Sequence, residues 1–142
     1  MFGNVFNKFK NGAKKVQNKE LMEAIVAGVM LVGMADGSIG QSESEKIEKL
    51  LAKNENLDGF KPSEIREVMT KYEGILDADF MVGQQKMMKE ITEISGNSEQ
   101  AEEVFLNVLA VAKADGEVDE KEKAVLVKVG SALRINLKDY GV

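Results

Sequence analysis

Two short turns carry the acidic residues whose types and spacing could do chemistry. Ala35-Asp36-Gly37 and Ala114-Asp115-Gly116 are each followed, six positions after the Gly, by a glutamate, which is Glu43 in the first copy and Glu122 in the second. This spacing matches the second half of an EF-hand loop, in which the Gly makes a sharp turn and the Glu binds calcium with both oxygens. The chemistry indicated is the binding of a hard cation by carboxylate oxygens.

The first half of an EF-hand loop is missing from both copies. Its first and third positions fall on Val32 and Met34 in one copy and on Val111 and Lys113 in the other. Because two of the usual oxygen ligands are absent each time, an ordinary high-affinity EF-hand is excluded.

The same residues have a second interpretation that requires no ligand. Gly37 and Gly116 can end a helix in the left-handed conformation, and Asp119 with Glu122 has the spacing of an N-cap and N3 pair, worth about 1 kcal/mol. Two features favour a ligand: the Asp recurs in both copies although a helix stop needs only the Gly, and acidic residues crowd the second copy. These are Asp115, Glu117, Asp119, Glu120 and Glu122, offset only by Lys121, and Asp77 with Asp79 could add further oxygens.

Composition excludes most other chemistries. The chain has no Cys and no His, so a thiolate nucleophile, a disulfide framework, the usual zinc sites and the commonest general base are all missing. A hydrolase built on paired carboxylates would have neither a nucleophile nor a cofactor loop to support it. We therefore expect a protein that is not an enzyme, with any metal held by oxygen atoms.

Charge is distributed unevenly along the chain. Residues 1–19 hold five Lys and no acid, whereas the rest carries 24 acidic residues against 14 basic ones. An acidic body is unsuited to nucleic acid as the main partner, because binding a phosphate backbone needs a positive surface. The N-terminus has no apolar block like that of a secretory signal, so the expected compartment is the cytoplasm.

The basic opening segment, residues 1–17, has the pattern of an amphipathic helix. Phe2, Val5, Phe6 and Phe9 follow the spacing i, i+3, i+4, i+7, with lysines between them. Such a helix either folds back with its aromatic side chains against the body or, through residues 1–15, contacts a membrane surface or a partner.

Hydrophobic periodicity predicts an all-α fold in a single compact domain, residues 1–142, with seven to eight helices. The stretch from residue 18 to 35 is apolar nearly all round, so it should lie at the centre, and Gly28 and Gly33 suggest that another helix passes close by. Its apolar run is shorter than the ~20 residues of a membrane span. The other expected helices cover residues 41–54, 62–72, a segment capped by Asp77 or Asp79 and ending at Gly96, a segment capped by Ser98, residues 120–133 and a short turn at 137–140.

An internal repeat relates the two halves. Placing residues 25–51 over residues 104–130, an offset of 79 positions, aligns the apolar helix, the Ala-Asp-Gly turn and the helix that follows. The repeat units cover about residues 20–54 and 98–134. We expect them to pack about a pseudo-two-fold axis that brings the two turns to related places on the surface.

Several of these segments resemble the TerB family of bacterial tellurite-resistance proteins, which is similar in turn to the helical domain of some membrane-anchored DnaJ-type co-chaperones. The resemblance runs the length of the chain. It rests on the Phe- and Lys-rich start, both Ala-Asp-Gly turns, the segment of residues 77–83 (DADFMVG), the segment of residues 113–123 (KADGEVDEKEK) and the terminal LKDYGV.

The resemblance implies a non-enzymatic, all-α module of tellurite resistance and stress response. It also implies divalent-cation binding (calcium, magnesium or manganese) through Asp36, Glu43, Asp115 and Glu122, with Asp119 as a helper. The first copy departs from the pattern, since Gly40, Gln41 and Ser42 stand where the second has Asp119, Glu120 and Lys121, so its site is expected to be the weaker. The expected partners are other tellurite-resistance or stress-complex proteins near the inner membrane, bound by a monomer. The alternative is a metal-free adaptor whose acidic face binds a basic partner.

Overall fold

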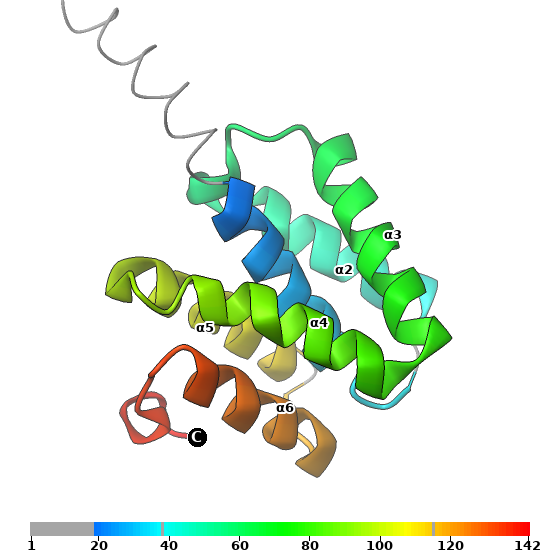
Figure 1. Ribbon diagram of the computed structural model, residues 1–142. Helices are drawn as coiled ribbons and strands as arrows, with labels where there is room; N and C mark the ends of the chain where they lie inside the picture. The colour runs from blue at the N-terminus through cyan, green and yellow to red at the C-terminus, as the bar shows by residue number, and fades with distance from the viewer. Residues whose placement is uncertain (1–18, 38, 115) are drawn as a thin grey trace, which may run out of the picture.

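The computed structural model describes residues 19–37, 39–114 and 116–142, and within these ranges the chain is helical and has no strand (Figure 1). The all-α prediction is confirmed. The predicted helix of residues 1–17 lies outside the described residues. The described residues form six α-helices and two 3₁₀ turns, namely residues 19–33, α2 (Gln41–Ala52), η1 (Glu55–Leu57), α3 (Pro62–Ala78), α4 (Phe80–Glu93), α5 (Ser98–Lys113), α6 (Glu120–Ala132) and η2 (Leu137–Tyr140).

The helix of residues 19–33, called the central helix below, is buried along most of its length (blue in Figure 1). At Gly28, an added Cβ would lie 2.5 Å from Cγ2 of Val108 on α5 and 3.9 Å from Cδ1 of Ile91 on α4. At Gly33, the nearest atom would be Cδ1 of Ile47 on α2, at 3.1 Å. The prediction that other helices pass close to these glycines is therefore confirmed. No helix in the described ranges combines the length and the apolarity needed to span a bilayer.

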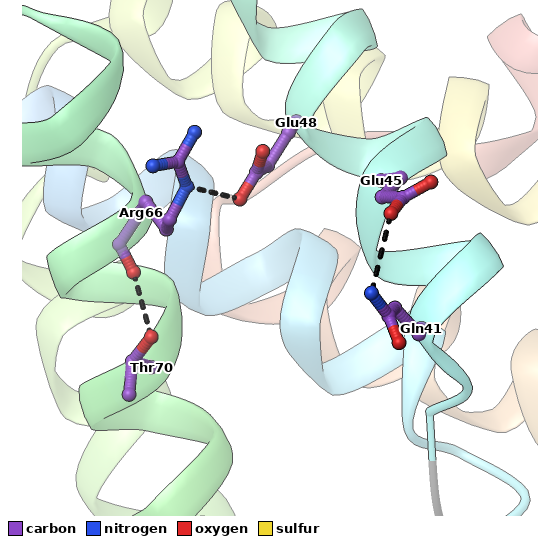
Figure 2. Close-up of polar contacts among 5 residues, drawn as sticks. All are labelled: Gln41, Glu45, Glu48, Arg66 and Thr70. Atoms are coloured by element: carbon purple, nitrogen blue, oxygen red, sulfur yellow. Dashed lines mark hydrogen bonds and ion pairs between the residues drawn. The ribbon is translucent and has the colours of Figure 1, made fainter.

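Polar contacts fix α2 against α3 and α5. Nε of Arg66 on α3 lies 2.9 Å from Oε1 of Glu48 on α2, and Figure 2 shows this ion pair bridging the two helices. At the other end of α2, Nδ2 of Asn54 donates to Oε1 of Glu103 at 2.8 Å and to Oδ1 of Asn107 at 3.2 Å, both on α5. The helix that follows the first turn is thereby held in a defined place relative to the second half.

The connection between the halves differs from the prediction in one respect. The helix expected to end near residue 72 continues to Ala78, so Asp77 lies in the last turn of α3 and not in a linker. Asp79 caps α4 by accepting a hydrogen bond from the backbone N–H of Val82 at 3.1 Å. Only one residue therefore separates α3 from α4, and the chain turns sharply there (Figure 1).

The start of α5 also differs from the prediction. The N-cap is Asn97, whose Oδ1 accepts from the backbone N–H of Gln100 at 3.1 Å, and Ser98 is already the first helical residue. Asn and Ser both make good N-caps, and sequence alone does not decide between neighbours. The difference moves the helix start by one position and leaves the buried face of α5 as expected.

Candidate functional site

The glycines of the two Ala-Asp-Gly turns have closely similar backbone conformations. Gly37 has φ +105° and Gly116 has φ +103°, in the left-handed region that favours glycine. The N–H of Gly37 donates to the carbonyl of Met34 at 2.8 Å, and the N–H of Gly116 donates to the carbonyl of Lys113 at 3.0 Å. These donor and acceptor pairs are related by the 79-position offset, so both turns close their helices in the same way.

Residues from both turns and from the helices after them line one pocket of about 220 Å³. Five carboxylates belong to its lining, together with apolar side chains from the central helix, α2 and α5. The carboxylates are Asp36, Glu43, Glu117, Asp119 and Glu122, and the apolar side chains include Val32, Ile47, Leu50 and Val111.

The lining pairs equivalent positions of the two halves. Glu43 and Glu122 are related by the 79-position offset, as are Val32 and Val111, and both members of each pair face this pocket. Of the residues predicted as cation ligands, the structure therefore brings together those of the first copy, Asp36 and Glu43, with Asp119 and Glu122 of the second.

The other predicted ligands are not placed at this pocket. Asp115 lies outside the described residues. Asp77 and Asp79 are absent from the pocket lining, because the helical continuation of α3 and the cap of α4 fix their positions elsewhere. The expectation that these two carboxylates could add oxygens to the turns is not supported by this arrangement.

Asp119 and Glu122 form the predicted capping pair. Oδ1 of Asp119 accepts from the backbone N–H of Glu122 at 2.7 Å, and Oε1 of Glu122 accepts from the backbone N–H of Asp119 at 3.1 Å. The capping interpretation is confirmed for this turn, and it occupies one oxygen of each carboxylate. The equivalent N-cap of α2 is Gly40, which has no side chain to cap with, and within the described ranges the carboxylates of Asp36 and Glu43 take no part in a cap.

Electrostatics link the two turns. Burial raises the pKa of the Glu122 carboxyl, and the neighbouring carboxylates of Asp119 and Asp36 raise it further, against the lowering effect of the backbone N–H of Asp119. Asp36 belongs to the first half and Glu122 to the second, so their carboxylates are close enough to repel each other. A cation placed between them would relieve this repulsion.

Lys46 is a pocket residue that sequence reasoning missed. It lies on α2, three positions after Glu43, and among the described lining residues it alone is cationic. The spacing i, i+3 places both side chains on the same face of α2, and this signal was present in the sequence. Five carboxylates against one ammonium leave the described lining strongly negative.

The donor chemistry fits a hard cation, because the polar groups of the acidic side chains are all oxygens. However, no three acidic side chains in the described ranges are grouped closely enough to hold a metal ion directly. Magnesium characteristically keeps several of its waters and takes only one or two protein carboxylates. The pocket therefore fits a hydrated cation better than one enclosed by protein ligands.

Within the described residues, the chain is all-helical and two helix-turn-helix segments line one acidic pocket, which places it in the class of small all-helical domains. The family model described as tellurite resistance protein TerB matches residues 22–141, so the chain belongs to the TerB family. Neither a curated protein nor a solved structure matches the chain significantly. The resemblance seen in the sequence is thus confirmed over the described body of the protein.

Proposed function

We propose that this protein is a non-enzymatic module that binds a hydrated divalent cation in the acidic pocket between its two Ala-Asp-Gly turns. The observation that carries the proposal is the convergence of Asp36 and Glu43 with Glu122 on one pocket, with mutual repulsion of Asp36 and Glu122. The cation would bridge the halves through carboxylate oxygens and retained water. Calcium, magnesium and manganese share the preference for oxygen ligands that this lining offers.

A thermal titration tests the proposal. A ligand that binds only the folded state adds about 2.7 kcal/mol of stability at 100 times its Kd. Melting curves of the full chain in chelator and in each of the three cations should therefore show a rise of about 10 °C at saturation, given the usual relation between stability and Tm. Asp36→Asn and Glu43→Gln should each lose most of this rise.

The matched control is Glu45→Gln. Glu45 lies on α2, is exposed and does not line the pocket, and the substitution changes the charge by the same amount as Glu43→Gln. The proposal fails if no cation raises the Tm of the parent. It also fails if the Glu45 variant loses as much of the rise as the Glu43 variant, because the effect would then be one of net charge.

A second candidate function is a metal-free adaptor that inserts a partner's Lys or Arg side chain into the same pocket. The apolar walls favour it, since the stem of a long basic side chain packs on apolar surface while its charged head meets carboxylates. Among the described residues, no three acidic side chains are grouped closely enough to hold a metal ion, which is also consistent with an adaptor. In this case a labelled Lys-rich peptide should bind the parent in chelator, and Asp36→Asn should weaken that binding.

We further propose that the cellular role is tellurite tolerance or a related stress response, exerted by docking on other proteins of the same system near the inner membrane. Membership of the TerB family supports the tellurite-resistance part of this proposal. Complementation tests this role. A strain lacking the protein should regain tellurite tolerance with the parent chain and with Glu45→Gln, and not with Asp36→Asn.

We also propose that the two halves arose by duplication of one helix-turn-helix unit. Support comes from the nearly equal φ of Gly37 and Gly116 and from the equivalent positions of Glu43 and Glu122 in the pocket. A shared pocket on the pseudo-two-fold axis accounts for the retention of the same turn in both halves.

A further inference from the structure

A second groove, of about 740 Å³, lies between the start of the central helix and α3, and the acidic pocket uses none of its residues. Its surface combines apolar and acidic side chains. Met22, Phe60 and Val68 supply the apolar part, and Glu23, Glu64 and Glu67 supply the carboxylates.

The lining follows two helical stripes. On α3 the groove residues are Glu64, Glu67, Val68 and Lys71, at the spacing i, i+3, i+4, i+7. On the central helix they fall at positions 19, 22 and 23, at the spacing i, i+3, i+4. Two helix faces that present such stripes side by side form the kind of groove that accepts an amphipathic helix.

We propose that this groove is the docking site of the chain's own N-terminal segment, residues 1–18. The segment precedes Lys19, which itself lines the groove, so its attachment point is at the groove. It also lies outside the part of the chain matched by the family model, which begins at residue 22. None of the groove residues lines the acidic pocket, so the two surfaces are separate.

Complementarity of sequence and surface supports this occupant. Phe2, Val5, Phe6 and Phe9 repeat the spacing of the α3 stripe, and over seven positions both span about 10 Å of helix. The segment carries four Lys and no acid, whereas three carboxylates and two lysines line the groove, which leaves the lining with a net negative charge. Ion pairs between the lysines of the segment and the carboxylates at the rim of the groove would fix the position of the segment along the groove. The Phe rings would bury the apolar side chains of the groove.

The segment is long enough to fold back from Lys19 onto the groove. Nine residues lie between Phe9 and Lys19, and extended chain covers up to about 30 Å over that number. They include Asn11-Gly12, a dipeptide that favours a turn, where the chain can reverse.

A single tryptophan tests the proposal in the full chain. The protein has no Trp, so Phe6→Trp introduces a unique reporter. Docking predicts blue-shifted emission and weak acrylamide quenching at all protein concentrations. Glu67→Lys, a charge reversal of an exposed groove residue, should lower the docking equilibrium about fivefold, as expected for one exposed ion pair, and so shift the emission to the red.

The control is Glu45→Lys in the same Phe6→Trp chain, which makes the same charge change on α2 outside the groove. It should leave emission and quenching unchanged, and replacing Lys8 or Lys10 by Glu should partly restore docking in the Glu67→Lys chain. Emission typical of exposed indole in the Phe6→Trp parent overturns the proposal. A blue shift that appears only with anionic vesicles also overturns it, because the segment would then bind a membrane. A blue shift that disappears on dilution overturns it too, because the segment would then bind a second copy of the chain.

Discussion

Gly28→Ala should destabilise the protein, although alanine is a far better helix former than glycine. The new Cβ would lie 2.5 Å from Cγ2 of Val108, a distance that forces one helix to shift. Val108 is fully buried, and its β-branched side chain has little rotamer freedom within α5. The contact matters for the pocket because it joins the central helix to α5, and each of these two helices leads into one of the turns.

The magnitude follows from two opposing terms. Overpacking a buried site costs about 1–3 kcal/mol, whereas Gly to Ala in a helix interior contributes about 1 kcal/mol of propensity. Because Val108 is fully buried and stiff, the overpacking cost should lie in the upper part of its range, about 2–3 kcal/mol, which leaves a net loss of about 1–2 kcal/mol. Gly74→Ala provides the matched control, because Gly74 lies inside α3 with nothing within 4 Å of its would-be Cβ, and it should gain about 1 kcal/mol.

Urea unfolding followed by far-UV circular dichroism measures both variants against the parent, with stability compared at constant m-value. Val108→Ala in the Gly28→Ala background should recover part of the loss, because it removes the atom that clashes, and the two changes should be clearly non-additive. If Gly28→Ala proves as stable as the parent, or if its effect equals that of Gly74→Ala, the close approach of the central helix and α5 is refuted.

Two further predictions concern hydrogen-bonded polar side chains. Glu122→Gln keeps an oxygen that can accept from the backbone N–H of Asp119 while removing the charge, so in chelator at pH 7 it should match or exceed the parent, and Glu122→Ala should lose about 1 kcal/mol. Because the pKa of Glu122 is raised in the folded state, its ionisation costs stability, and the advantage of Gln over Glu should grow as the pH rises through that pKa in urea titrations. Tyr72→Phe should cost about 1–3 kcal/mol, because the buried hydroxyl donates to Oε2 of Glu90 and that acceptor would lose its donor. Burial and Glu90 raise the pKa of Tyr72, so above pH 10 the parent should lose stability more steeply than the Phe variant, and equal slopes would contradict the assignment.

Much of the fold could be predicted because the signals were local and strong. The apolar run of residues 21–35, interrupted by Gly28 and Gly33, indicated a central helix with close neighbours, and both close approaches are present. Helix ends were less predictable, since Asn97 and Ser98 are both good caps and only the fold decides between them. The length of α3 was missed because the sequence DAD of residues 77–79 resembles a loop, whereas burial of Leu76 extends the helix into this segment, as far as Ala78.

The site could be predicted only in part. Recurrence of the turn identified Asp36, Glu43, Asp119 and Glu122, and their convergence followed from the assumed pseudo-symmetry. Lys46 breaks that symmetry, since Val125 stands at the equivalent position, and a comparison of the two copies therefore hid it. Which carboxylate oxygens accept capping hydrogen bonds, and which remain available in the pocket, depends on side-chain geometry. The spacing of the residues in the sequence does not determine that geometry.

Because capping uses carboxylate oxygens in the second copy, we predict that the first copy contributes more to cation binding than the second. The first copy was expected to be the weaker because Gly40 replaces Asp119, but the loss of the capping residue is also what leaves Glu43 without a cap to hold its oxygens. In the second copy, Oδ1 of Asp119 and Oε1 of Glu122 already accept backbone hydrogen bonds. A cation must compete with those hydrogen bonds in the second copy but not in the first. In the cation titration, Glu43→Gln should therefore cost more of the thermal shift than Glu122→Gln, and the opposite order would show that capping does not compete with cation binding.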